Sequence, residues 1–382
     1  MSKTDAEIIS TLIFLSLVGI YLFKTRKELE FHYGIIIRRW KKGKEKIDKL
    51  VRGREKILRH IGDAFVVLGI AISIASFFLL IQYTLKFQQA FGLALPAVKG
   101  IKYPGAIIPI PFWYWLLSVF IVVVSHESMH AIFSRVENVK LKSYGIIFFL
   151  FFPIGAFVDP EKKTFEKMSG IKKMRILAAG SFGNLLVFAI VTILAIASTK
   201  IADSLIESFG VKFDVLPNTP AEKAGLEGIM LKINNQTIKN RVDLIDFLNK
   251  TKPGENVTIL TTKGEFNLTL AENPENKEIG FIGITNTSEV YKYKASSQYV
   301  PDAFINALLV WYRILFWLAI LNLGVGVANL MPAKPLDGGY MLEDIFKKFF
   351  GKRGEDIENV LSSLIFFLLL FNIFVVGTIK KI

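Results

Sequence analysis

Long apolar runs separated by short polar segments dominate the pattern of this 382-residue chain. Six of the runs are long enough to form a helix that crosses a bilayer, because about 20 residues suffice for one crossing. We therefore predict a polytopic α-helical membrane protein with about six transmembrane helices. The runs lie near residues 7–23, 64–86, 112–133, 174–198, 304–331 and 358–378.

A seventh apolar run, YGIIFFLFFPIGAFV at 144–158, is shorter and contains Pro153 and Gly155. Its β-branched and aromatic residues favour an extended, membrane-associated β hairpin or a re-entrant segment over a full crossing. The alternative is a seventh membrane span. An exposed strand edge in such a hairpin could accept an extended substrate segment by β-addition. Gly155, Ala156 and Phe157 are therefore predicted to contact substrate.

The block 199–303 differs in kind from the rest of the chain. Its apolar residues alternate in short runs separated by Asn, Gly and Pro, and 240–250 has the spacing of a helix. This pattern predicts one soluble α+β domain at 205–295, inserted between the fourth and fifth spans.

Charge sets the expected orientation and the class of partner. The segment 24–61 holds 14 Lys or Arg against five Asp or Glu, 134–173 is also basic, and 332–357 contains the basic stretch KKFFGKRG. Cytoplasmic loops of membrane proteins carry such an excess, so the net charge of +14 favours a multi-pass cell-membrane protein over a nucleic-acid binder. Both termini and the block 199–303 are then expected outside. The chain has no Cys, which excludes disulfides and thiolate metal sites.

The stretch VVVSHESMH at 122–130 places ionisable side chains inside an apolar run. On a helix, His126 and His130 project from nearly the same side, so both can reach one Zn²⁺ with Glu127 beside them. Ionisable groups within membrane spans are costly and usually functional. The alternative is that the histidines cap the helix at the interface while Glu127 extends toward Arg135.

A catalytic zinc site has three protein ligands and one open position. Because Cys is absent and the other two His lie in or beside the basic segment, the third ligand should be a carboxylate. Asp337, in NLMPAKPLDGG at 329–339, is the best candidate. Pro332 and Pro335 should end the preceding helix. Asp337 should begin a new amphipathic helix, and capping that helix is its alternative role.

The stretch AAGSFGN at 178–184 lies within the fourth span. Gly180 and Gly183 permit close helix packing. Packing does not account for Asn184, whose amide needs hydrogen-bond partners in an apolar medium.

Together, the three motifs resemble the site-2 protease family of zinc intramembrane metalloproteases. HESMH, AAGSFGN and NLMPAKPLDGG agree with that family in order, separation and span placement, over roughly 110–198 and 304–345. The resemblance implies that His126, His130 and Asp337 hold one Zn²⁺ per chain.

The same resemblance implies the chemistry and the substrates. Glu127 would be the general base, and Asn184 would hold the substrate backbone or stabilise charge at the scissile carbonyl. The substrates would be single- or multi-pass membrane proteins, cut in or near their transmembrane segments by regulated intramembrane proteolysis, with the active site toward the cytoplasmic side.

The inserted block resembles a PDZ domain. NTPAEKAGL at 218–226 and LKINNQTI at 231–238 match elements of that domain, whereas EGIM at 227–230 replaces its usual Gly-Asp. GFIGI at 280–284 is similar to a carboxylate-binding loop, so Gly280, Phe281, Ile282 and Gly283 are predicted to receive a peptide C-terminus. The domain is expected on the extracytoplasmic side.

The motifs divide the chain into five segments. These are two N-terminal transmembrane helices joined by a basic loop at 1–111, the first part of the catalytic core at 112–198, the PDZ-like domain at 205–295, the second part of the core at 304–345, and a cytoplasmic loop with the last helix at 346–382.

Three other functions fit part of the pattern. A non-catalytic membrane PDZ receptor with a structural metal would need a fourth protein ligand. A metal transporter would place several polar residues at span centres. A zinc protease for a lipidated protein tail shares the first motif, but the motifs that contain Asn184 and Asp337 favour the site-2 class.

Overall fold

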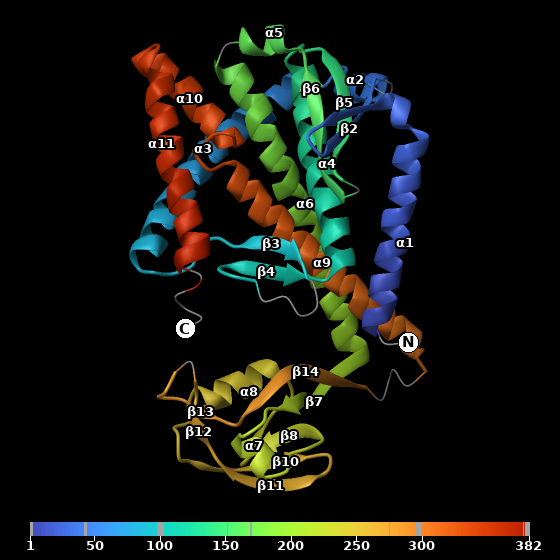
Figure 1. The fold of residues 1–382 in the computed structure, drawn as a ribbon, viewed down its shortest axis with the longest axis vertical. Coiled ribbons are helices and arrows are strands. Elements are labelled where there is room, and N and C mark those ends of the chain that lie inside the picture. Colours follow the sequence, from blue (N-terminus) through green and yellow to red (C-terminus); the bar gives the residue numbers. More distant parts are fainter. Residues whose placement is uncertain are drawn as a thin grey trace. The chain divides into compact units, whose positions relative to one another are not determined.

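Five helices of the computed structural model are long and apolar enough to cross a membrane (Figure 1). They coincide with five of the six predicted spans. The helix α1 (Lys3–Lys24) occupies the place of the remaining span, but its described apolar part, Ile8–Lys24, is shorter than the others, so its crossing stays a prediction. The five are α3 (Glu55–Leu85), α4 (Phe112–Val136), α6 (Gly170–Leu205), α9 (Asp302–Asn329), and α11 (Arg353–Leu370) with the π-helical η3 (Phe371–Val376) that continues it.

The structure describes residues 3–41, 44–97, 103–150, 152–168, 170–274, 276–294, 299–376 and 378. The chain divides into two units. Unit 1 comprises residues 1–195 and 311–382, and unit 2 comprises residues 196–310. Every motif predicted to carry the metal chemistry lies in unit 1.

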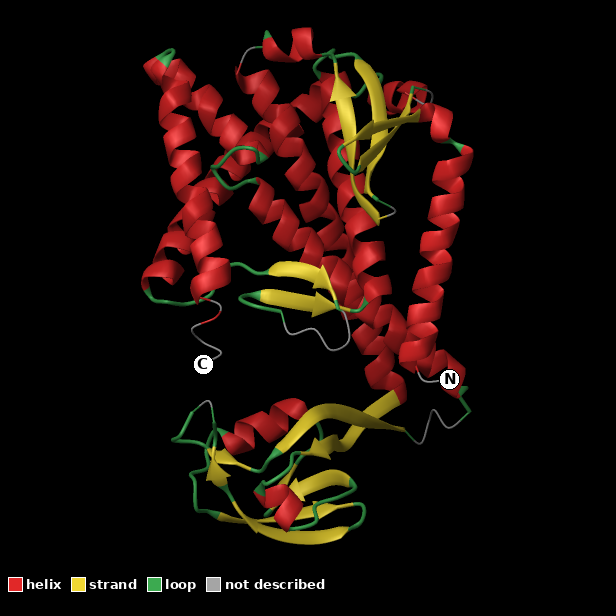
Figure 2. Cartoon of the chain, in the orientation of Figure 1, coloured by secondary structure: helices red, strands yellow, loops and turns green. Residues whose placement is uncertain are grey.

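The apolar segment after α4 is a hairpin and not a seventh helix. Strands β5 (Leu141–Phe149) and β6 (Phe152–Pro160) pair antiparallel. The sheet has four strands in the order β1–β2–β5–β6, so β6 lies at its edge. Figure 2 shows this sheet beside the helices of unit 1.

The other two strands come from the basic segment 24–61, which the charge pattern predicted only as a loop. After the short η1 (Arg26–Glu28), β1 (Leu29–His32) and β2 (Ile35–Trp40) form a hairpin that pairs with β5. Tyr33 and Gly34 form its turn with φ of 46° and 87°, the left-handed conformations that a tight two-residue hairpin requires. The basic composition of the segment gave no indication of these two strands.

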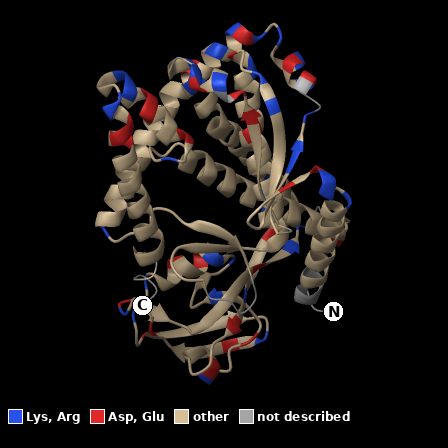
Figure 3. Cartoon of the chain, turned by 45° about the horizontal axis from the view of Figure 1, so that its top comes forward, with Lys and Arg blue, Asp and Glu red and all other residues tan. Residues whose placement is uncertain are grey.

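Shorter elements flank the spans of unit 1. They are α2 (Lys44–Val51), the parallel strands β3 (Leu93–Pro96) and β4 (Ile107–Ile110), α5 (Lys162–Glu166) and α10 (Asp337–Phe350). Charged residues gather over α2, α5 and the turn between α10 and α11, whereas the middles of the long helices are almost free of them (Figure 3). This distribution is typical of helices that cross an apolar layer.

Unit 2 contains an α+β domain. Its main sheet follows the order β11–β10–β8–β7–β14, with β9 attached to β8, and β12 and β13 form a separate pair. Thirteen apolar residues form its buried core. The elements are β7 (Ile206–Val215), α7 (Pro220–Lys223), β8 (Ile229–Ile233), β9 (Gln236–Thr237), α8 (Arg241–Leu248), β10 (Asn256–Thr261), β11 (Gly264–Thr269), β12 (Ala271–Glu272), β13 (Gly280–Phe281) and β14 (Ile284–Tyr293).

Candidate metal centre and active site

Two imidazoles meet near the end of α4. His126 and His130 are one helical turn apart, and their Nε2 atoms lie 3.0 Å from each other. A helix brings residues i and i+4 to the same face, so the predicted geometry of the HESMH motif is what the structure contains. Both side chains are largely buried.

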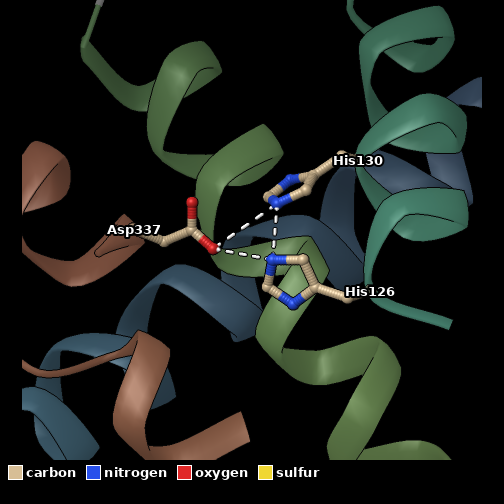
Figure 4. A group of neighbouring side chains, drawn as sticks. All are labelled: His126, His130 and Asp337. Carbon is tan, nitrogen blue, oxygen red and sulfur yellow. Dashed lines mark hydrogen bonds and ion pairs between the residues drawn. The ribbon is translucent and has the colours of Figure 1, made fainter. Parts of the chain in front are cut away.

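Asp337 reaches the same point from a distant part of the sequence. Its Oδ2 lies 3.3 Å from Nε2 of His126 and 3.4 Å from Nε2 of His130. Figure 4 shows the carboxylate directed at both rings. The three ligand atoms lie within 4.8 Å of one another. Asp337 is also the first residue of α10, but the residue before it, Leu336, occupies the N-cap position.

The segment between α9 and α10 holds Asp337 in place by folding back on itself. Leu330, Met331 and Ala333 are almost completely buried. A Cβ on Gly338 would lie 2.1 Å from the carbonyl oxygen of Leu330, and one on Gly339 would lie 2.2 Å from the amide nitrogen of Lys334. Only glycine permits approaches this close, which accounts for the Gly-Gly pair after the aspartate.

The helix α6 packs directly against the imidazoles. A Cβ on Gly180 would lie 2.4 Å from Nε2 of His130 and 2.8 Å from Cε1 of His126. One on Gly183 would lie 2.6 Å from the carbonyl oxygen of Ser125. The two glycines therefore let α6 approach α4 closely enough to form the back wall of the site.

The outer nitrogen of each imidazole faces a polar atom. Nδ1 of His130 lies 2.8 Å from the carbonyl oxygen of Ile176, so Nδ1 carries the proton and Nε2 presents its lone pair to the centre. Nδ1 of His126 lies 3.4 Å from Nδ2 of Asn184, whose Oδ1 accepts a 2.6 Å hydrogen bond from Ser125 Oγ. Asn184 has no exposed surface. It therefore lies behind His126 and not on the open side of the site.

These donors fit a divalent metal ion. Oδ2 of Asp337 is buried and has no hydrogen-bond donor among the residues that the structure describes. A buried carboxylate oxygen without a donor is costly unless a cation balances it. Two imidazole nitrogens and one carboxylate oxygen make up the ligand set of many catalytic zinc sites, and no fourth ligand candidate belongs to this group in the described chain.

Glu127 points to the sheet and not to the end of its own helix. Its Oε2 accepts a 2.8 Å hydrogen bond from the backbone amide of Val158 in β6. Arg135 is paired instead with Asp48 of α2. The alternative in which Glu127 extends toward Arg135 is therefore not what the structure contains, and the carboxylate stands between the metal ligands and the edge strand.

The three residues predicted to contact substrate lie on β6, beside Val158. Gly155 and Ala156 line an apolar cavity at the edge of the sheet. Phe157 instead packs over β5, where a Cβ on Gly145 would lie 2.7 Å from its ring, and the guanidinium of Arg39 sits 4.7 Å from the ring centroid. Phe157 thus joins strands within the sheet, whereas Gly155 and Ala156 face the space outside it.

A buried ionic network, not predicted from the sequence, supports the Asp337 segment. Nζ of Lys334 lies 2.6 Å from Glu343 Oε2 and 2.9 Å from Oε2 of Glu358, which has no exposed surface. Its backbone amide donates to Ser362 Oγ at 2.7 Å. Burial by itself would lower the pKa of Lys334 and raise that of Glu343. The hydrogen bonds between the two groups outweigh burial, so the pKa of Lys334 is raised and that of Glu343 is lowered relative to their ordinary values. The signal in the sequence was a lysine within the apolar, proline-containing stretch MPAKPL at 331–336.

The predicted peptide-binding loop lies in unit 2, just before β14. The amide of Gly280 donates to the carbonyl of Thr251, while the carbonyls of Ile282 and Gly283 accept from Ala221 and Leu216. Gly283 has φ of 92°, and a Cβ there would lie 2.1 Å from the side chain of Thr219. The loop is thus anchored to its own domain.

The fold and the site define a class: a membrane protein that builds a His-His-Asp metal-ligand set on its helices. A model of peptidase family M50 matches residues 114–372, more than half of the chain. The chain therefore belongs to peptidase family M50 and is an integral membrane metallopeptidase.

Two curated relatives match this chain over most of its length. An uncharacterized protein of Methanocaldococcus jannaschii is 26% identical over 374 residues, which cover 94% of this chain and 92% of the relative. A protein of Clostridium acetobutylicum named "Putative zinc metalloprotease" is 24% identical over 331 residues, covering 70% of this chain and 96% of the relative.

Proposed function

We propose that this M50 member is a zinc-dependent intramembrane endopeptidase of the site-2 protease type. The observation that carries the proposal is the meeting of His126 and His130 of α4 with Asp337 at the start of α10, with Glu127 between these residues and a strand edge. Zinc is favoured over other divalent ions by the nitrogen-rich donor set. The relative named as a zinc metalloprotease supports the same metal.

The metal would supply Lewis acidity: a zinc ion lowers the pKa of a water molecule to about 7 and polarises a carbonyl. The chain's own residues supply the rest of the chemistry. Glu127 accepts a proton from the attacking water and later returns it to the leaving amine. Its carboxylate is well placed for this, because it follows His126 directly and faces the strand beside which substrate would lie.

The edge of β6 offers a binding mode for the substrate. A transmembrane helix hides its carbonyls in internal hydrogen bonds, so the segment to be cut must unwind before water can attack it. An unwound segment could pair with β6, whose outer edge no other strand occupies in the described chain. Pairing would compete with Glu127 for the amide of Val158 and so release the carboxylate for proton transfer.

Asn184 has two candidate roles, and its burial favours one of them. The notion that it stabilises charge at the scissile carbonyl requires contact with substrate, whereas the side chain has no exposed surface. Turning its amide by 180° would place Oδ1 beside Nδ1 of His126 and Nδ2 beside Ser125 Oγ. Metal-binding histidines usually donate their outer N–H to such an acceptor. We therefore assign Asn184 to orienting His126.

The orientation in the membrane follows from charge. Basic residues gather at the end of unit 1 that contains α2, α5 and the α10–α11 turn (Figure 3). Their excess supports a cytoplasmic location for that end. The HESMH motif lies in the last three turns of α4, which continues into this charged region, so the site would open toward the cytoplasm and the inserted domain would lie outside.

The edge strand of the inserted domain supports its assignment as a PDZ-like domain. β14 is the last strand of its sheet and contacts α8, on which Val242 and Ile245 are 62% and 50% exposed. An extended peptide could pair with β14 and place apolar side chains against these two residues. Its terminal carboxylate would meet the loop 280–283. The ligand would be a membrane protein's newly exposed C-terminus.

The decisive experiment compares the detergent-purified protein with its Glu127→Gln variant. We expect both proteins to contain one zinc ion, and only the parent to cut a helical model substrate, because glutamine keeps the shape of the side chain but cannot accept the proton. Cleavage at the parental rate by Glu127→Gln would overturn the role of Glu127. A parent that binds zinc but cuts no membrane substrate would favour the receptor alternative.

A further inference from the structure

An apolar cavity of about 330 Å³ lies between α1, α4 and the edge strand β6. Its walls are Phe14 of α1, the stretch of α4 from Trp113 to Val124, Ile146 of β5, and Pro153, Gly155 and Ala156 of β6. The lining contains no charged side chain. Its volume is within the range of cavities that hold small ligands or large side chains.

The first helix contributes Phe14 to the wall of this cavity. Near one end, α1 contacts α4 through Phe14, whose ring centroid lies 5.5 Å from that of Trp113, and through the hydrogen bond from Trp113 Nε1 to Ser10. Near the other end, the guanidinium of Arg38 in β2 lies 5.1 Å from the ring centroid of Tyr21. The helix α1 therefore contacts α4 beside the cavity and β2 near its other end.

The cavity also opens along the part of β6 that lies next to the active site. The position that a Cβ on Gly155 would take has no heavy atom within 4 Å beyond its chain neighbours. Val158, which donates to Glu127, follows two residues after Ala156. With a rise of about 3.3 Å per residue in a strand, a side chain in the cavity would be two or three residues away from the residue beside Glu127.

We propose that this cavity is a specificity pocket for one large apolar side chain, such as leucine or phenylalanine, of the substrate strand that pairs with β6. The proposal rests on the proposed function. The pocket selects by size because Gly155 and Ala156 leave the space that the substrate side chain fills. The residue selected would lie two or three positions from the bond that is cut.

The experiment uses the full-length protein and model transmembrane substrates that differ at single positions near the cut, with alanine, leucine or phenylalanine at each. For one such position we expect the parent to show kcat/KM at least about 10-fold higher for leucine or phenylalanine than for alanine, the size of effect that filling an apolar pocket produces. Gly155→Val should abolish this preference, so that kcat/KM becomes similar for the alanine, leucine and phenylalanine substrates. Phe14→Ala should shift the preference toward tryptophan. Its matched control is Leu17→Ala, on the exposed face of α1.

Binding of the same peptides to the Glu127→Gln protein separates the two proposals. Selective binding that Gly155→Val removes would support the pocket even if the parent cut nothing, in which case the proposed function alone would fail. Equal binding of all peptides by the Glu127→Gln protein would overturn the pocket. Loss of a co-purifying lipid from Gly155→Val, together with unchanged selectivity, would assign the cavity to a lipid chain and also overturn it.

Discussion

Unit 1 and unit 2 differ in the polar side chains that they bury completely. The buried core of unit 2 consists of apolar residues. In the described chain, all five polar side chains with no exposed surface lie in unit 1, and they are Ser181, Asn184, Asn322, Glu358 and Asn372. Many large apolar side chains of α1, α3 and α6 face outward.

The surrounding medium accounts for this difference. In water, apolar burial drives folding, so unit 2 has an ordinary core. In a bilayer, an apolar side chain gains little by turning inward, and close packing and polar contacts join the helices instead. We therefore expect substitutions of buried polar residues to have their largest effects in unit 1, and substitutions of buried apolar residues to dominate in unit 2.

The largest expected effect in this comparison is that of Asp337→Ala. This substitution removes the one carboxylate of the candidate ligand group among the described residues and leaves two imidazoles. Zinc affinity should therefore fall by more than about 100-fold, which exceeds the effect typical of losing a residue that only hydrogen-bonds to a ligand. Competition with a chelator measures the affinity, and cleavage should vanish in parallel.

The matched control for this substitution is Asp243→Ala in unit 2. That carboxylate accepts a hydrogen bond from the amide of Lys239 near the start of α8, so its loss should cost about 1 kcal/mol of unit 2 stability and leave zinc bound. Full zinc affinity in Asp337→Ala would show that the carboxylate is not a ligand.

Asn184→Asp separates the two roles that its amide could have. As the acceptor for Nδ1–H of His126, aspartate should keep zinc affinity at or above the parental level. If Asn184 instead donates a hydrogen bond to the developing oxyanion, aspartate cannot replace it, and kcat would fall by about 10²–10³.

Asn184→Ala completes the test, because it lacks the acceptor as well as the donor. We expect its zinc affinity to fall about 10–100-fold. Parental zinc affinity in Asn184→Ala, with kcat reduced equally in both variants, would return Asn184 to the oxyanion role.

The sequence predicted which residues meet at the candidate metal centre, because their chemistry is rare in apolar surroundings. His126 and His130 stand out within a span, and the proline-rich end of α9 directs attention to Asp337. The orientation of Asn184 could not be predicted, because the spacing of AAGSFGN places it on α6 without saying which atom faces His126. The β1–β2 hairpin was also missed, since its strands are held by pairing with β5, more than 100 residues away.

A smaller effect is expected from Lys334→Met. The variant leaves Glu343 and the fully buried Glu358 without their shared cation. An unpaired buried charge costs about 3–5 kcal/mol, so α10 and α11 should exchange their amide hydrogens faster. Because Lys334 lies three residues before Asp337, zinc affinity should fall about 10-fold.

Two further variants test whether charge burial is the cause. Lys347→Met removes a lysine that is 40% exposed, and its effect should be much smaller. Adding Glu358→Gln to Lys334→Met should restore part of the protection, since it removes the uncompensated charge. Equal effects of Lys334→Met and Lys347→Met would argue against a specific role for the buried network.

The smallest expected effect on the metal centre comes from an apolar truncation in the core of unit 2. Ile259 of β10 has no exposed surface and belongs to the core of that domain. Ile259→Ala should lower the unfolding free energy of unit 2 by about 2–5 kcal/mol, measured by thermal unfolding or hydrogen exchange of β10. Zinc affinity and the cleavage of a short helical substrate should remain at parental levels, because unit 2 contributes no ligand to the His126, His130 and Asp337 group. If zinc affinity fell together with the stability of unit 2, the two units would unfold as one. The difference between their cores would then not make them independently stable.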